Sequence, residues 1–436
     1  MTDLVTIGKI AKMKNILILL ILFTLQSLVV LSLPKYNQDK KEAQELNTRG
    51  GLPNFFAKAM RGDPIKVAYL GGSITAQNGW RAYSLEGFKQ RFPKAVFTEI
   101  NAAIGGTGSN FGVFRLQDHV LKFRPDLVFV EFAVNDDGSP AEKIIRSMEG
   151  IIRQIWQFNP GTDICFVYTI KETFLETEKN GKLPASAVTM EKVADKYHIP
   201  TINFGFEVGK MVDQKQLIFK GVAKELNGVK VFSPDGVHPY LETGHHIYQT
   251  VLERSFDTMA AAKIPKRIKH RLPKPMAPDY FSNTKMVDIA DAILSKNWEV
   301  FRAKDQPLFA GFGKYLEKLG KASLSGETLT IRFKGKAIGA YDIMGPDAGK
   351  VIVEIDGLVE DTISRFDAYC TYRRMNFFLI DHLEDKEHEV VFRLLAEPFD
   401  KTVILAKNGN VIKNPDDYEE NNWYVGKIMI DGNLLP

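Results

Sequence analysis

The chain has 436 residues, of which 44% are hydrophobic and 25% charged, as is ordinary for a globular protein with more than one domain. A formal net charge of +4 is small for this length and does not indicate nucleic acid as a partner. Only two cysteines are present, Cys165 and Cys370, and they make neither a disulfide framework nor a metal site. Both are therefore expected in the core.

Residues 1–33 have the pattern of an export signal. Three lysines precede an apolar run over residues 16–33, as a charged region precedes the hydrophobic region of a signal peptide. The run is also long enough for an uncleaved membrane anchor, and the sequence leaves this alternative open. The protein is expected to be exported to the periplasm, the cell surface or the medium. Contact with a membrane is expected only through this segment, if it is not cleaved.

Residues 34–64, which begin with a polar, charged stretch to about residue 47, are predicted to form a tether, and residues 65–262 then alternate between strand-like and helix-like segments. The run at 127–130 is continuously apolar, as a central strand buried on both faces should be. This alternation predicts βαβ units and a parallel sheet with helices on both faces. The expected strands cover 66–70, 96–100, 127–132, 164–170 and 201–204, and the expected helices cover 81–91, 112–123, 141–158, 185–198 and 241–262.

Residues 263–279 differ in composition from the segments around them. Six basic residues and four prolines lie within 263–278, and proline at this density interrupts helices and sheets. We interpret the segment as a solvated linker between domains, although its charge would also attract a polyanion. From 280 to 436, short β-branched runs separated by turn residues predict a β-sandwich domain. The clearest of these runs are 328–333, 337–342, 351–355 and 389–393.

Polar groups follow several strands of the predicted α/β domain. Ser73 comes after two glycines at the end of the first strand, Gly106 lies in a small-residue loop after the second, and Asn135 follows the third. Asp235 and His238 lie three residues apart in a loop near the end of the domain. Each feature alone has an ordinary interpretation as a turn, a helix cap or a solvated loop pair. Together they supply the nucleophile, base, orienting acid and oxyanion donors that acyl transfer needs.

These four blocks, in this order, resemble the SGNH (GDSL-type) hydrolase family. Residues 71–75 (Gly-Gly-Ser-Ile-Thr) are similar to its first block, 101–106 to its second, 133–136 to its third and 235–238 to its Asp-x-x-His block. The resemblance spans about 65–262 and implies a flavodoxin-like, three-layer α/β/α domain. It also implies a serine esterase that needs no metal and no cofactor.

The resemblance assigns a role to each matched residue. Ser73 is implied as the nucleophile, His238 as the base and Asp235 as the acid that orients it. The backbone N–H groups of Ser73 and Gly106, together with the side chain of Asn135, are implied as oxyanion donors, with Gly105 as an alternative to Gly106. Two positions depart from the family pattern: Gly72 replaces the usual Asp, and Ala133 replaces the usual Gly. Neither position supplies a catalytic atom.

Other candidates in this domain have weaker grounds. Trp80 and Arg81 follow the nucleophile turn and are pocket-lining candidates, although core packing is an equal interpretation for Trp80. Glu131 is interpreted as structural, and His245 and His246 as surface or packing residues. Substrate-binding residues are not predicted.

An export signal, an esterase-like domain and an appended β-sandwich together resemble exported enzymes that remove small acyl groups from glycans. The expected substrate is an acylated carbohydrate, with O-acetyl the expected ester, and nucleic acid is not an expected partner. The alternatives are a lipase or acyltransferase of the same family acting on other esters, or a catalytically dead glycan-binding surface protein. Ser73, His238 and Asn135 are all present, which disfavours the dead form.

Overall fold

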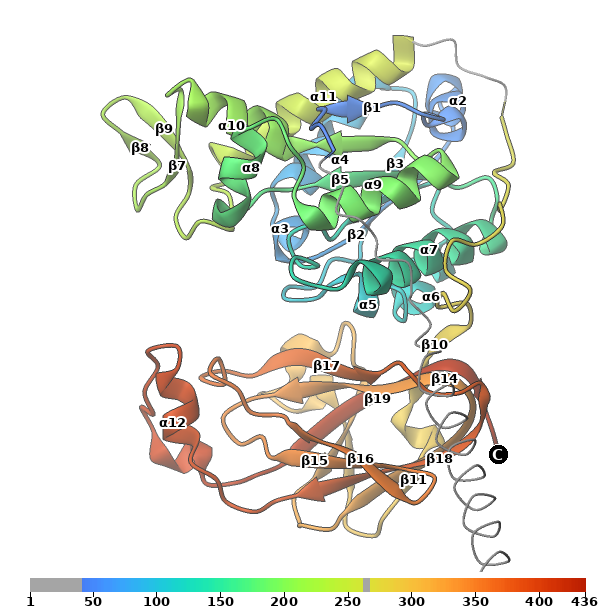
Figure 1. Ribbon diagram of the computed structural model, residues 1–436, viewed down its shortest axis with the longest axis vertical. Coiled ribbons are helices and arrows are strands. Elements are labelled where there is room, and N and C mark those ends of the chain that lie inside the picture. The colour runs from blue at the N-terminus through green and yellow to red at the C-terminus, as the bar shows by residue number, and fades with distance from the viewer. Residues whose placement is uncertain (1–40, 262–266) are drawn as a thin grey trace, which may run out of the picture. The chain divides into compact units, whose positions relative to one another are not determined.

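The computed structural model describes residues 41–261 and 267–436 (Figure 1). The predicted signal or anchor, residues 1–33, and the start of the predicted tether lie outside this range. In the described stretches, every helix is too short or too polar to cross a bilayer.

A six-stranded sheet in the order β1-β6-β5-β4-β2-β3 is the centre of the first domain (Figure 1). All its strands are parallel except β1, which pairs antiparallel with β6. The order of the parallel strands, β3-β2-β4-β5-β6, is that of flavodoxin-like folds. The strands are β1 (Leu46–Asn47), β2 (Ile65–Gly71), β3 (Phe97–Asn101), β4 (Leu127–Glu131), β5 (Asp163–Tyr168) and β6 (Thr201–Asn203).

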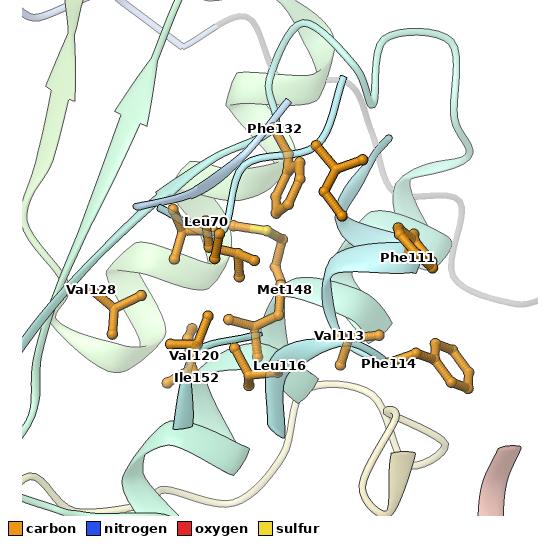
Figure 2. Packing of buried hydrophobic residues seen from close by; sticks show 14 of the residues in the cluster. Leu70, Phe111, Val113, Phe114, Leu116, Val120, Val128, Phe132, Met148 and Ile152 are labelled. Atoms are coloured by element: carbon orange, nitrogen blue, oxygen red, sulfur yellow. The ribbon is translucent and has the colours of Figure 1, made fainter. Parts of the chain in front are cut away.

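Helices cover both faces of this sheet, and each face packs against its helices in a separate hydrophobic core. One core joins the sheet to α5, α6, α7 and α9, and Figure 2 shows Leu70 and Val128 of the sheet packing with Met148 and Ile152 of α7. The other core joins the sheet to α2, α4, α10 and α11. The helices are α2 (Pro53–Arg61), α3 (Ser73–Ala76), α4 (Trp80–Arg91), α5 (Ser109–Gly112), α6 (Leu116–His119), α7 (Ala141–Phe158), α8 (Leu175–Lys179), α9 (Ala185–Tyr197), α10 (Phe204–Asp213) and α11 (Gly244–Ala261).

A small three-stranded sheet, β7-β9-β8, precedes the loop that contains Asp235 and His238. Its strands are β7 (Leu217–Lys220), β8 (Glu225–Leu226) and β9 (Val229–Ser233). Single-turn 3₁₀ helices occur at η1 (Leu121–Phe123), η2 (Glu172–Phe174), η3 (Ile289–Asp291), η4 (Ala303–Asp305), η5 (Ala310–Phe312) and η6 (Pro415–Tyr418).

The described part of the predicted tether, 41–64, does not have a tether's structure. It contains β1 and the helix α2, whose Phe55 and Phe56 are at most 1% exposed. Phe55 packs edge-on against Phe88 and Phe256, which are far away in sequence. This segment is therefore part of the α/β domain.

The predicted helix at 112–123 is instead divided among α5, α6 and η1. Between α5 and α6 lies Arg115, which is completely buried and donates hydrogen bonds to the carbonyl oxygens of Ala102 and Gly71. A buried guanidinium must find such acceptors. These acceptors are tertiary partners, which local helix-like composition does not reveal.

The described part of the predicted linker, 267–279, contains no helix or strand, but it is fixed to the α/β domain. His270 Nε2 lies 2.8 Å from Asp163 Oδ1, and its ring stacks on Trp156. Arg153 donates a hydrogen bond of 2.8 Å to the Pro273 carbonyl. The segment is thus anchored at these points, while its basic residues in the described range, Arg267, Lys269, Arg271 and Lys274, are exposed to solvent.

Residues 280–436 form an antiparallel β domain, so the prediction of an α/β domain followed by a β domain is confirmed. The runs predicted at 328–333 and 337–342 are a single 17-residue strand, β14, which pairs with β18 in its first half and with β17 and β19 in its second. The elements of the β domain are β10 (Thr284–Asp288), β11 (Ile293–Leu294), β12 (Glu299–Arg302), β13 (Lys318–Ala322), β14 (Thr328–Met344), β15 (Lys350–Ile355), β16 (Leu358–Ser364), β17 (Arg374–Ile380), β18 (Lys386–Leu395), α12 (Lys401–Ala406) and β19 (Trp423–Leu434).

Glu178 in α8 is expected to make stability depend on pH. Burial raises the pKa of its carboxyl from about 4.5 to about 8, and hydrogen bonds from Asn203 oppose this only in part. The folded state therefore favours the protonated form, so the stabilisation is complete below pH 4.5 and is lost as the pH rises through 8. Relative to wild type, Glu178→Gln should raise the melting temperature more at pH 9 than at pH 5. Equal differences at the two pH values in scanning calorimetry would contradict this assignment.

Candidate active site

Ser73 lies at the carboxyl end of β2, where the strand order of the sheet reverses. The strand ends at Gly71, Gly72 forms the N-cap of α3, and Ser73 is the first residue of that helix. Because the first N–H groups of a helix have no intrahelical acceptor, the N–H of Ser73 is available to a ligand. The side chain of Ser73 is half-buried.

His238 and Asp235 lie in the loop after β9 and are hydrogen-bonded in series to Ser73. His238 Nε2 is 2.8 Å from Ser73 Oγ, and His238 Nδ1 is 2.7 Å from Asp235 Oδ2. A carboxylate at Nδ1 holds the ring proton there, so Nε2 accepts a hydrogen bond from the Ser73 hydroxyl. The structure thus brings together the three residues that the sequence singled out for nucleophile, base and orienting acid.

The turn around Asp235 explains how a three-residue spacing produces this contact. Asp235 Oδ1 accepts hydrogen bonds of 2.8 Å from the backbone N–H groups of both Val237 and His238. Burial would raise the pKa of Asp235. The hydrogen bonds from His238, Val237 and the Ser233 hydroxyl outweigh burial and hold the pKa well below its ordinary value. Asp235 is therefore a carboxylate at neutral pH.

Asn135, in the loop after β4, lies directly against the turn that precedes Ser73. A Cβ atom added to Gly72 would be 2.0 Å from Asn135 Oδ1. Within 41–261 and 267–436, the side-chain amide of Asn135 has no hydrogen-bond partner. Asn135 can therefore donate a hydrogen bond to a bound ligand beside Ser73.

Gly105 and Gly106 form an exposed turn in the loop after β3. Gly106 has a φ of +73°, which favours glycine. A Cβ atom added to Gly105 would be 3.5 Å from Ser73 Cβ, so this glycine pair lies beside the serine. Either glycine N–H remains a candidate donor, as the sequence left it.

If Asn135 is an oxyanion donor, as the family resemblance implies, Gly72→Ala should lower ester hydrolysis by about 10²–10³-fold, the cost of losing one such donor. The added methyl group would occupy the position of Asn135 Oδ1 and force this side chain away. The measurement is kcat for 4-nitrophenyl acetate, with Gly311→Ala as the control, because a Cβ atom added to this exposed glycine meets no atom within 4 Å. Near wild-type turnover in Gly72→Ala would show that the position of Asn135 does not matter.

The two pocket-lining candidates, Trp80 and Arg81, are buried in the structure. Trp80 is completely buried against Tyr69, Phe129 and Phe204, so it belongs to the core rather than to a pocket. Arg81 is also buried and donates a hydrogen bond to the carbonyl of Thr75. Neither residue lines an open site.

The two histidines of α11 are not part of the Ser73 cluster. His245 is buried, and its Nδ1 accepts a hydrogen bond of 3.0 Å from the backbone N–H of Trp80 at the start of α4. Burial lowers the pKa of His245 to about 3, so the ring is neutral. His246 is exposed and stacks on Tyr83. These positions agree with packing and surface roles.

The sequence did not reveal which residues hold the loops around the site together. Asp136 Oδ1 accepts a hydrogen bond of 2.9 Å from the N–H of Ser109, which joins the loops after β4 and β3. Burial raises the pKa of Asp136 to about 6. Lys171 Nζ lies 2.7 Å from Asp137 Oδ2, and the N–H of Glu172 donates to the Gly236 carbonyl. Lys171 and Glu172 directly follow the strand expected at 164–170, so a search of strand ends could have found them.

Among the described residues, no group of three or more His, Cys, Asp or Glu side chains is placed to hold a metal ion.

Residues 69–242 match the model of the GDSL-like Lipase/Acylhydrolase family. No curated protein matches the chain. The fold is similar to two crystal structures of a two-domain esterase (CEX) active on acetylated mannans, one of them co-crystallised with mannopentaose. The complex with mannopentaose has 22% sequence identity to this chain and a TM-score of 0.67, and the alignment covers 90% of this chain and 97% of the esterase chain. The other structure has 20% sequence identity and a TM-score of 0.69, and its alignment covers 90% of this chain and 98% of the esterase chain. At these identities the similarity establishes the fold.

Proposed function

We propose a mechanism and a substrate class for this carboxylic ester hydrolase, whose residues 69–242 form a GDSL-like lipase/acylhydrolase domain. The proposed reaction is hydrolysis of O-acyl esters, chiefly O-acetyl esters, on a carbohydrate. The observation that carries the mechanism is the hydrogen-bonded series from Ser73 through His238 to Asp235, with distances of 2.8 and 2.7 Å.

Ser73 acts as the nucleophile in this proposal. Its Oγ attacks the ester carbonyl carbon while His238 Nε2 takes the hydroxyl proton. The carboxylate of Asp235 keeps the ring oriented and stabilises the imidazolium that forms. His238 then gives the proton to the departing sugar oxygen, which leaves an acyl group on Ser73. Water, deprotonated by His238, attacks this acyl-enzyme and releases the carboxylic acid and free Ser73.

The negative charge on the carbonyl oxygen needs donors that are in place before the reaction. We assign this role to the N–H of Ser73, the N–H of Gly106 or its neighbour Gly105, and the side-chain amide of Asn135. The Ser73 N–H is at the start of a helix, and the Asn135 amide has no partner within the described residues. In comparable sites, each such donor increases kcat by a factor of about 10²–10³.

The carbohydrate part of the proposal is supported by fold similarity over 90% of the chain to an esterase active on acetylated mannans. Export, which rests on the pattern of residues 1–33, is part of the same proposal because acetylated polysaccharides are extracellular substrates. A lipase or acyltransferase acting on other esters is the alternative within the same family.

Acetate release from a panel of substrates tests this proposal. The panel contains acetylated mannan, acetylated xylan and 4-nitrophenyl esters of increasing chain length. We expect the wild-type protein to release acetate from at least one polysaccharide and to prefer acetate among the 4-nitrophenyl esters. Faster hydrolysis of long-chain esters would favour a lipase, and an acylated sugar product in place of free acetate would favour a transferase.

A further inference from the structure

Glu131 is a buried carboxylate next to the proposed nucleophile, and the mechanism above does not use it. It is the last residue of β4 and is 1% exposed. Its two carboxylate oxygens accept hydrogen bonds of 2.7 Å from the Thr75 hydroxyl and 2.8 Å from the Thr169 hydroxyl. The backbone N–H of Gly72 also donates to it. Three donors from two neighbouring segments thus meet at one side chain.

Keeping this carboxylate in the core has a cost in free energy. Burial raises the pKa of Glu131, and the hydrogen bonds from Thr75, Thr169 and Gly72 oppose the effect. No lysine, arginine or histidine of the described residues contributes a neutralising charge. A buried carboxylate without a cation is weak evidence for a role in stability, because an apolar side chain of similar size would avoid the desolvation cost.

The donors to Glu131 lie on both sides of Ser73 in the chain. Gly72 precedes it, and Thr75 is in the same helical turn. The Gly72 carbonyl accepts a hydrogen bond of 3.0 Å from the Ala76 N–H. Gly72 is therefore held through both its N–H and its carbonyl oxygen, which fixes the peptide plane that contains the Ser73 N–H.

Thr169 connects the same carboxylate to the base. It directly follows β5, and three residues later the N–H of Glu172 donates a hydrogen bond of 2.7 Å to the carbonyl of Gly236, two residues before His238. Glu131 is thus linked through short connections to both the nucleophile turn and the loop that carries the base.

We propose that Glu131 is a positioning residue that holds the Ser73 turn in its position relative to the His238 loop. The inference rests on the proposed function, since Ser73 and His238 are its reacting groups. Glu131 touches no reacting atom and acts through Thr75, Gly72 and Thr169. Displacement of a nucleophile by about 1 Å can cost about 10²-fold in rate.

The test compares Glu131→Gln with Glu149→Gln, a second buried glutamate whose partners are Tyr197 and the backbone of 276–277. We expect Glu131→Gln to lower kcat for 4-nitrophenyl acetate about 10–100-fold, with KM changed less than about twofold. Labelling of Ser73 by a 4-nitrophenyl organophosphate should slow in parallel. Glu149→Gln should leave both rates unchanged, whatever its effect on the melting temperature.

Thr75→Val and Thr75→Ser provide a second test that does not depend on whether Glu131→Gln folds. Valine has the shape of threonine without the hydroxyl, so it should lower kcat, whereas serine should restore most of the rate. If Glu131 and Thr75 act through one hydrogen bond, their combined effect should be less than additive.

Wild-type kcat and labelling rate in folded Glu131→Gln, or in Thr75→Val, would overturn the inference. If the wild-type protein itself hydrolyses no ester, the proposed function fails instead, so the two failures are distinguishable.

Discussion

Ser73→Ala is expected to lower the turnover of 4-nitrophenyl acetate by at least about 10³-fold, because the acyl-enzyme can no longer form. A residual rate above that of buffer is expected, since the proposed oxyanion donors and the binding site remain. The loss should appear in kcat rather than in KM. The melting temperature should change little, because Ser73 is half-buried and alanine fits its position.

Ser139→Ala is the matched control for this experiment. Ser139 is exposed in the loop after β4, and its replacement should leave turnover unchanged. If Ser73→Ala retained more than about a tenth of the wild-type kcat, Ser73 would not be the nucleophile.

His238→Ala is expected to cause a loss of similar size, because the Ser73 hydroxyl would lose the base that lies 2.8 Å from it. Asp235 cannot replace the imidazole, since its carboxylate bonds the far side of the ring from Ser73 and remains held by the backbone N–H groups of residues 237 and 238. The measurement is kcat over a range of pH. The variant should be slower than wild type at every pH of that range.

His246→Ala is the control for the second prediction. This histidine is exposed on α11 and makes no contact with Ser73. An equal loss in both variants would mean that the effect arises from the stability of the loop and α11 rather than from proton transfer.

Much of the α/β domain could be predicted from the sequence, because strand-like and helix-like segments alternate and the run at 127–130 in β4 is continuously apolar. The helix expected at 141–158 has the same bounds as α7. The helix α2 could not be predicted in the same way, because Phe55 and Phe56 are recognisable as core residues only next to Phe88 and Phe256. Contacts of this kind depend on the tertiary fold, and a local pattern does not contain them.

The candidate site likewise contains residues that the sequence reveals and contacts that only the fold reveals. Ser73, Asn135 and the Asp235–His238 pair could be predicted because each lies at a strand end or within one short turn. The contacts of Gly72 with Asn135 and of Glu131 with two threonines could not, since they join segments that follow different strands. Gly72 stands where the family usually has Asp, and the structure shows that any side chain there would collide with Asn135 as it is placed here.

The most direct test of the account is intact-protein and peptide mass spectrometry after incubation with diethyl 4-nitrophenyl phosphate. This reagent transfers a diethylphosphoryl group to an activated serine. We expect one adduct per chain, on the peptide that contains Ser73, with loss of esterase activity in proportion to labelling. An adduct on another residue, or full activity after incubation without any adduct, would contradict the assignment of Ser73 as the nucleophile.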